Sequence, residues 1–294
     1  MINFSKLDIS RKKAFDSYHA ARDKSNSEES FATTFIWNDY YKMETAVDKG
    51  FYFTRYNIDP VLPEYGVPAG EGDFREAMGE LFALAHERGQ KLILRFVTAK
   101  DREKIEALFP GRFEFKPRRD LWDYVYKTED LIRLSGKKYH SKKNHWNTFL
   151  ASYDFCYERP NLQTVLSECA PLMYKWVREK KQNINEFELC AMERYFENYE
   201  ALNQLGAVIR IGGKIVAMSF GEKLSDDMAL VQIEKADEEI KGAYAAINKL
   251  FCENEWSGCA YINREEDMGI EGLKRAKESY RPILLVEKYA AVEV

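Results

Sequence analysis

The hydrophobic period of the chain changes just before residue 207, and this change limits the possible folds more than any other feature of the sequence. Upstream, apolar residues recur at helical spacing over residues 162–177 and again over 189–199. Downstream, two apolar runs at residues 207–211 and 214–220 are separated only by Gly212-Gly213, a spacing that predicts a tight β-hairpin. Helical segments that lead directly into paired strands indicate a mixed α/β domain.

The alternation of helices and strands continues beyond the hairpin. A strand, a helix, a strand, a helix and a final strand are predicted, in that order, at residues 228–234, 242–253, 260–263, 269–279 and 283–289. In outline this order resembles the GNAT acyltransferase fold, although many α/β folds alternate in a similar way.

The first half of the chain repeats most of these element types in nearly the same order, without obvious sequence identity. Helices are predicted at residues 12–21, 28–34, 74–88 and 101–109, and strands at 40–47, 51–56, 91–97, 113–115 and 124–126. We therefore predict an α/β (α+β) protein with two tandem GNAT-like domains, each a mixed sheet flanked by helices. The predicted parts are a degenerate domain at residues 1–128, a basic junction segment at 129–153 and a second domain at 154–294; one large α/β domain is the alternative.

Composition argues against several other classes of protein. The formal net charge is −4, so any attraction to a polyanion must come from a local patch. The five cysteines, an odd number without CxxC spacing, predict neither a disulfide framework nor a metal site. No run of 18 apolar residues occurs and the start has no signal-peptide character, so we expect a cytoplasmic protein without a membrane-spanning segment.

A basic segment without acidic residues lies between Asp130 and Asp154. Helical spacing places four of its side chains on one face and four on an adjoining apolar face. The first set is Lys138, Lys142, His145 and Phe149, and the second is Tyr139, Trp146, Leu150 and Tyr153. Basic side chains beside aromatic ones suit contacts with phosphates and with stacked bases, while a solvated linker helix is the alternative.

Two further segments follow predicted strands and carry groups suited to chemistry. Residues 233–244 join a strand to a helix, and a helix N-terminus can bind phosphate; favourable acids near a helix start are the alternative. Residues 263–282 begin at the end of a strand, where ligands of α/β proteins bind. There Asp267, Lys277 and Tyr280 supply an acid, a charge and a hydroxyl for proton transfer or oxyanion stabilisation; a capped surface helix is the alternative.

Together these three segments resemble the catalytic domain of the bacterial phosphatidylglycerol lysyltransferases and the stand-alone proteins that share it. The resemblance covers about residues 130–285 and rests on three groups of residues: Gly136, Lys138, Tyr139, Lys142, Asn144, Asn147 and Phe149; Glu234, Lys235, Ala236, Gly242, Tyr244 and Asn248; and Asn263, Glu265, Asp267, Gly269, Gly272, Leu273, Lys277, Ser279, Tyr280 and Pro282. It implies a tandem GNAT fold related to the Fem peptidyltransferases, which move an aminoacyl group from a charged tRNA to an amine. The lysyltransferases pass the group to a lipid hydroxyl, but this chain lacks their membrane-spanning bundle.

The resemblance and the segment chemistry together define the expected site. The expected substrate-binding residues are Lys138, Tyr139, Lys142, Lys143, Asn144, Asn147, Lys235, Gly242, Tyr244, Asn248, Asn263 and Gly269. Asp267 is the first choice for the general base and Glu234 the second, while Lys277 or Tyr280 is expected to face the oxyanion.

The turn before the predicted helix at 242–253 bears on the acyl donor. CoA-dependent members of the fold carry a Gln/Arg-x-x-Gly-x-Gly/Ala turn for the pyrophosphate, whereas here Glu239 takes the first position and Tyr244 the last. A close like-charge contact costs on the order of 1 kcal/mol, which disfavours acetyl-CoA. We therefore predict an acyltransferase that needs no cofactor and passes an aminoacyl group from a charged tRNA to an amine or hydroxyl acceptor. A CoA-dependent N-acetyltransferase and a non-catalytic tRNA- or ligand-binding module are the alternatives.

Overall fold

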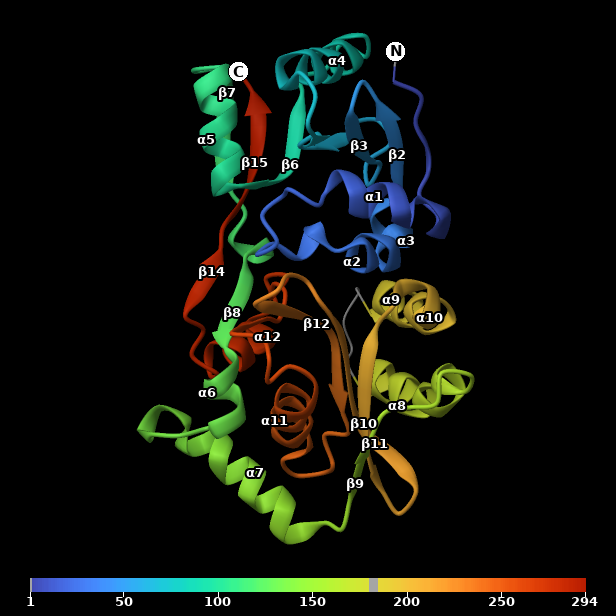
Figure 1. Cartoon of the computed structure of the whole chain (residues 1–294), viewed down its shortest axis with the longest axis vertical. Coiled ribbons are helices and arrows are strands. Elements are labelled where there is room, and N and C mark those ends of the chain that lie inside the picture. The colour runs from blue at the N-terminus through green and yellow to red at the C-terminus, as the bar shows by residue number, and fades with distance from the viewer. Residues whose placement is uncertain (1, 180–184) are drawn as a thin grey trace. The chain divides into compact units, whose positions relative to one another are not determined.

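The computed structural model describes residues 2–179 and 185–294 of the chain. It divides into two compact units: unit 1 comprises Met1–Trp122 with Val286–Val294, and unit 2 comprises Asp123–Leu285. Each unit has its own mixed sheet with helices packed on it (Figure 1), which confirms the predicted fold class.

Unit 1 contains an eight-stranded sheet in the order β1-β2-β3-β4-β6-β15-β7, with β5 paired to β3. Its strands are β1 (Ser5–Lys6), β2 (Met43–Asp48), β3 (Phe51–Tyr56), β4 (Glu64–Gly66), β5 (Ala69–Gly70), β6 (Ile93–Thr98), β7 (Phe113–Pro117) and β15 (Lys288–Glu293). Its helices are α1 (Lys12–Tyr18), α2 (Phe31–Ile36), α3 (Asn38–Tyr41), α4 (Phe74–His86) and α5 (Ala99–Leu108).

The aromatic run of β3 explains why helices cover both faces of this sheet. Phe51 and Phe53 point to one face, where they join a core cluster with Met78 of α4. Tyr52 points to the other face, where its ring lies 5.6 Å from the ring of Phe15 in α1. Successive side chains of a strand alternate between faces, so an uninterrupted apolar run needs cover on both.

Unit 2 contains a seven-stranded sheet in the order β14-β8-β13-β12-β11-β10-β9. Its strands are β8 (Asp123–Lys127), β9 (Cys156–Glu158), β10 (Leu205–Ile211), β11 (Lys214–Lys223), β12 (Met228–Ala236), β13 (Tyr261–Asn263) and β14 (Leu284–Val286). Its helices are α6 (Thr128–Arg133), α7 (His140–Ser152), α8 (Val165–Glu179), α9 (Asn185–Glu197), α10 (Tyr199–Leu202), α11 (Ala243–Glu255) and α12 (Glu271–Glu278). The predicted hairpin is confirmed, since β10 and β11 pair antiparallel up to Ile211 and Lys214.

The strands β12 and β13 create the opening on which the site of unit 2 depends. They pair in parallel over three residues, and the pairing ends at Leu230 and Asn263. Beyond that point β12 continues to Ala236 without β13 beside it, so side chains at the ends of both strands meet around the divergence. The helix α11 packs on β10, β11 and β12 and lies alongside α7 (Figure 1).

Two strand assignments differ from the predicted domain boundaries. The strand predicted at 124–126 for the first domain is β8, which pairs with β13 in the sheet of unit 2. The single strand predicted at 283–289 is two strands, β14 in the sheet of unit 2 and β15 between β6 and β7 of unit 1. Local hydrophobic pattern predicts that a segment is extended but does not identify the strand with which it pairs.

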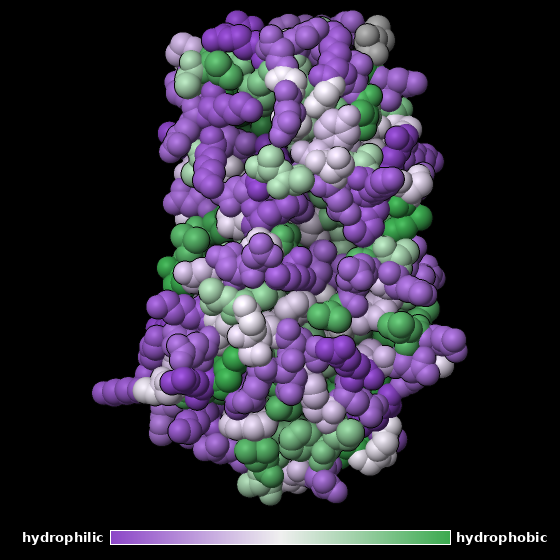
Figure 2. All heavy atoms as spheres, viewed as in Figure 1, coloured by the Kyte–Doolittle hydropathy of each residue, from purple (hydrophilic) through white to green (hydrophobic). Residues whose placement is uncertain are grey.

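Hydrophilic side chains cover most of the face drawn in Figure 2, and the hydrophobic ones form small separate groups. Within residues 2–179 and 185–294, no helix combines the length and the apolar character that crossing a bilayer requires.

Candidate functional site

The contact between α7 and α11 determines what the start of α11 can bind. Gly242, with a φ of +85°, precedes α11, and a Cβ placed on it would lie 2.2 Å from the carbonyl oxygen of His145 and 3.0 Å from Cβ of Phe149. The residue before Gly242 is held at the end of α7 as well, because the amide of Lys241 donates to the hydroxyl of Tyr153 at 3.2 Å. The glycine therefore lets two helices approach each other, and a backbone carbonyl lies against the turn that would bind a pyrophosphate in a CoA-dependent relative.

A buried ion pair lies where β12 and β13 diverge. Oε1 of Glu234, near the end of β12, lies 2.6 Å from Nη2 of Arg264, the residue that follows β13. Its other oxygen accepts a hydrogen bond from Nδ2 of Asn248 in α11 at 3.0 Å. The side chains of Glu234 and Arg264 are only 10% and 12% exposed. Burial alone would lower the pKa of Arg264, but the carboxylate of Glu234 raises it above its ordinary value, so the guanidinium stays charged.

Lys142 joins this ion pair through an aromatic ring. Its ammonium lies 4.1 Å from the ring centroid of Tyr280, and the guanidinium carbon of Arg264 lies 4.9 Å from the same centroid. Burial, and then the charge of Arg264, lower the pKa of Lys142 to about 8, against a smaller opposing effect of Glu234. A lysine with this pKa can release or accept a proton near neutral pH, which general acid–base catalysis requires.

Three buried polar atoms near Glu234 make no hydrogen bond within the described part of the chain. They are Nη1 of Arg264, Oδ1 of Asn248 and Oγ of Ser219, and Ser219 is the residue paired with Glu234 across β11 and β12. Buried polar groups in proteins are normally hydrogen-bonded. A donor, an acceptor and a hydroxyl gathered around one carboxylate are therefore groups that a polar ligand would satisfy.

The loop after β13 is held by two of the predicted catalytic residues. Asp267 accepts hydrogen bonds from the hydroxyl of Tyr124 at 2.6 Å and from the amide of Gly269 at 2.8 Å. Nζ of Lys277 donates to the carbonyl of Arg264 at 2.5 Å and to a second loop carbonyl, and burial lowers the pKa of Lys277 to about 8. In this geometry both side chains position the backbone that carries Arg264.

Asn263 and Tyr139 contribute to the same support. Nδ2 of Asn263 donates to Asp123 at 3.0 Å, and Oδ1 of Asn263 accepts from the amide of Glu265 at 2.7 Å. The hydroxyl of Tyr139 donates to the backbone carbonyl of Tyr280 at 3.1 Å. These two predicted binding residues are fully buried and bonded to the protein itself.

Two other predicted binding residues, Lys235 of β12 and Tyr244 of α11, contact Trp176 of α8. The ammonium of Lys235 lies 3.6 Å from the ring centroid of Trp176 and pairs with Glu188. The hydroxyl of Tyr244 accepts from Nε1 of Trp176 at 3.1 Å, and burial raises the pKa of Tyr244 to about 12. Neither side chain joins the group around Glu234.

The lysines of the basic segment lie in two different environments. Lys142 packs inward, whereas Lys138 is exposed and pairs with Asp130 at 3.1 Å. The predicted residues Lys143, Asn144 and Asn147 are also exposed. The prediction assigned Phe149 to the basic face and Leu150 to the apolar face. This was wrong, because Phe149 is fully buried and Leu150 is 47% exposed.

The structure thus brings together four predicted residues, Lys142, Glu234, Asn248 and Tyr280, and adds Arg264, which the sequence analysis did not select. A signal was present, since Arg264 directly follows a predicted strand and ligands of α/β proteins bind at such ends.

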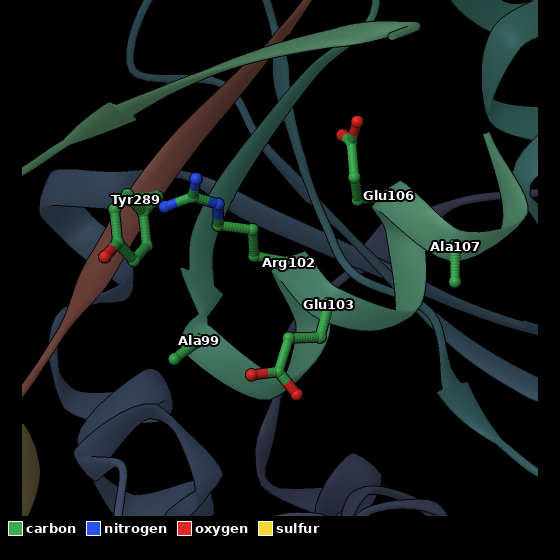
Figure 3. A pocket seen from close by; sticks show the side chains of 6 residues that line it. All are labelled: Ala99, Arg102, Glu103, Glu106, Ala107 and Tyr289. Atoms are coloured by element: carbon green, nitrogen blue, oxygen red, sulfur yellow. The ribbon is translucent and has the colours of Figure 1, made fainter. Parts of the chain in front are cut away.

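Two charged surface hollows lie among the described residues of unit 1. The larger, of about 470 Å³, is shown in Figure 3. The guanidinium of its Arg102 lies 5.2 Å from the ring centroid of Tyr289, and the carboxylates of Glu103 and Glu106 also line this hollow.

The fold is that of the tandem GNAT proteins. FemX (TM-score 0.59, 10% identity, 100% of this chain and 98% of that one) and a tandem GNAT protein of the clavulanic acid pathway (0.50, 8%, 100% and 98%) share this fold. The family model of the C-terminal part of phosphatidylglycerol lysyltransferases matches residues 19–292, and the chain therefore belongs to that family.

Solved and curated relatives agree with this membership. A conserved protein of unknown function from Bacteroides thetaiotaomicron is 33% identical, with a TM-score of 0.92 over 100% of both chains. L-PGS from Bacillus licheniformis shares the fold, with a TM-score of 0.69 and 16% identity over 98% of this chain and 93% of that one. An uncharacterised protein of Mycoplasmoides gallisepticum is 23% identical over 177 residues, which are 57% of this chain and 54% of that protein. The chain thus spans about half the length of this curated relative.

Proposed function

We propose that this chain is an acyltransferase that moves an aminoacyl group from a charged tRNA to an amine or hydroxyl acceptor in the cytoplasm. The observation that carries the proposal is the pair of cations, Lys142 and Arg264, that meet at Tyr280 beside the buried carboxylate of Glu234. Family membership supports acyl transfer, and the contact of Gly242 with α7 disfavours CoA as the donor.

An aminoacyl ester is already activated, so the protein mainly has to align the acceptor and stabilise the tetrahedral oxyanion. In the proposed reaction the acceptor nitrogen or oxygen attacks the ester carbonyl, and Nη1 of Arg264 donates to the oxyanion. Neutral Lys142 takes the proton of the acceptor and returns it to the ribose oxygen as the ester C–O bond breaks. Glu234 holds the guanidinium in place, and Asn248 in turn donates to Glu234. This geometry favours Lys142, rather than Asp267 or Glu234, as the proton carrier.

The exposed lysines of the basic segment support RNA as the carrier of the acyl group. Lys138 and Lys143 lie at the surface near the start of α7, and the ion pair of Lys138 is itself exposed, so it costs little to exchange for a phosphate contact. Replacing both lysines by Ala should weaken tRNA binding and reduce its salt dependence by a slope of up to about 2. An unchanged affinity and slope would remove this support.

The decisive experiment follows the loss of aminoacyl ester from bulk charged tRNA, with acetyl-CoA tested in parallel. Acceptors should include peptide amines and phosphatidylglycerol vesicles. The matched pair of variants is Lys142→Met and Lys214→Met, of which the second removes an exposed charge at the start of β11 in the same unit. We expect a loss of about 10²-fold or more in turnover for the first and near-normal turnover for the second, the scale of lost acid–base catalysis.

Three outcomes would contradict the proposal. Equal turnover of the two variants would remove Lys142 from the reaction. Turnover of acetyl-CoA alone would identify an N-acetyltransferase. Binding of charged tRNA without turnover with any acceptor would identify a binding module.

A further inference from the structure

The second hollow of unit 1, of about 220 Å³, is lined by charged side chains at the end of β6 and the start of α5. Each molecule in liquid water occupies roughly 30 Å³, so the hollow has room for about seven groups of the size of a water molecule. A ligand of that size is a small metabolite rather than a nucleotide or a polymer.

One part of the lining has more negative than positive charge. The guanidinium of Arg22 makes two hydrogen bonds to the carboxylate of Asp101, at 3.0 and 2.9 Å, and its Nε donates to Glu29 at 2.9 Å. One cation therefore faces two carboxylates. His19 donates to or accepts from Glu29 at 2.6 Å, and burial lowers the pKa of His19, so the imidazole adds no compensating charge near neutral pH.

Another part of the lining has an unmatched cation. Among the described residues no acid pairs with Lys104, whose ammonium lies 3.8 Å from the ring centroid of Phe74. The neighbouring Lys100 is already paired with Asp23 at 2.8 Å. Burial lowers the pKa of Lys104 and the nearby carboxylate of Asp101 opposes this effect, but Lys104 is exposed, so its ammonium can reach an anionic partner.

We infer that this hollow binds a small zwitterion, an α-amino acid being the simplest, with its carboxylate at Lys104 and its ammonium at the Arg22–Glu29–Asp101 group. The three cations and three acids that line the hollow have no net charge. A simple anion would be attracted to Lys104 but repelled by the surplus carboxylate of the Arg22–Glu29–Asp101 group. A simple cation would be attracted to that group but repelled by Lys104. Only a ligand with both charges matches both parts of the lining.

The inference is tested by titrating the full chain with glycine, L-alanine and L-lysine by calorimetry at low salt. Each amino acid is compared with its N-acetyl derivative and with its amide, which remove the positive and the negative charge in turn. We expect each change to weaken binding about tenfold or more, the scale of a lost hydrogen bond to a charged group. Acetate and inorganic phosphate serve as simple anions.

Variants of Lys104 locate the carboxylate. Lys104→Met should weaken binding of the amino acid about tenfold or more and leave binding of its amide unchanged, and Lys104→Arg should restore the affinity. Lys13→Met, which removes an exposed charge from α1 of the same unit, is the matched control and should bind normally.

Absence of amino-acid binding, or an affinity for acetate, phosphate or the amide equal to that for the amino acid, would overturn the inference. Because the comparison of ligands uses the unmodified chain, it decides the question even if a variant misfolds. The hollow belongs to unit 1 and the proposed acyl-transfer site to unit 2, so either proposal can fail without the other.

Discussion

The contact between Gly242 and α7 can be tested with a single methyl group. In Gly242→Ala the new Cβ would lie 2.2 Å from the carbonyl oxygen of His145 and 3.0 Å from Cβ of Phe149. The backbone there has a φ of +85°, which L-residues adopt at a cost of about 1–2 kcal/mol. Forcing one extra carbon into a packed contact costs about a further 1–3 kcal/mol. We therefore expect the free energy of unfolding of unit 2 to fall by about 2–5 kcal/mol.

A second glycine separates the two contributions. Gly213 in the β10–β11 turn has a similar φ of +80°, but no atom lies within 4 Å of a Cβ placed on it. Gly213→Ala should therefore lose only the conformational part, about 1–2 kcal/mol.

Urea unfolding followed by tryptophan fluorescence measures the difference, since Trp146 of α7 packs against the core of unit 2. With a slope of about 2 kcal/mol per molar urea, Gly242→Ala should lower the midpoint by about 1 M or more. Equal midpoints for the two variants would refute the reasoning. If Gly242 instead served a phosphate, its Ala variant would be no less stable than Gly213→Ala but would lose binding of the acyl donor.

Three further predictions concern the charges of unit 2. Lys142→Met should raise the free energy of unfolding at pH 7 by about 1 kcal/mol, after allowance for solvent screening, because the folded-state pKa of Lys142, about 8, lies below the ordinary 10.5. The stability of the wild type should increase as the pH rises from 8 to 10.5, and pH-dependent urea titrations should show no difference between the two proteins above that range. Glu234→Gln leaves the charge of Arg264 buried and uncompensated, so stability should fall by about 3–5 kcal/mol by the same method, and a loss below 1 kcal/mol would contradict the buried pair. Asp267→Asn can no longer accept from both Tyr124 and Gly269 with a charged carboxylate, so we expect a loss of about 1–3 kcal/mol; full stability with lost turnover would instead favour Asp267 as the base.

The fold was predictable to the extent that local pattern controls it. Gly212-Gly213 between two apolar runs predicted the β10–β11 hairpin, and the helix predicted at residues 242–253 corresponds to α11 (Ala243–Glu255). The partner of a strand depends on backbone hydrogen bonds with residues far along the chain. The local sequence of residues 283–289 therefore could not indicate that β14 and β15 belong to different sheets.

The site was predictable in its residue types but not in their roles. Asp267 and Glu234 have the same side-chain chemistry and both follow or end a predicted strand, so the sequence alone could not tell which one holds a turn and which one holds an arginine. Likewise Lys142 and Lys143 differ by one position, and the 100° between neighbours on a helix places one ammonium over Tyr280 and leaves the other exposed.

The position of β15 has a consequence for the order in which the molecule can form during synthesis. Tyr289 of β15 pairs with Val97 of β6, roughly 190 residues earlier in the chain. Until the ribosome has released that late segment, β6 and β7 face each other across a missing strand, and both expose unpaired backbone edges. The first half of the chain therefore cannot complete its sheet as it emerges, and a chain shortened at residue 285 would lose a central strand of unit 1 rather than a tail of unit 2.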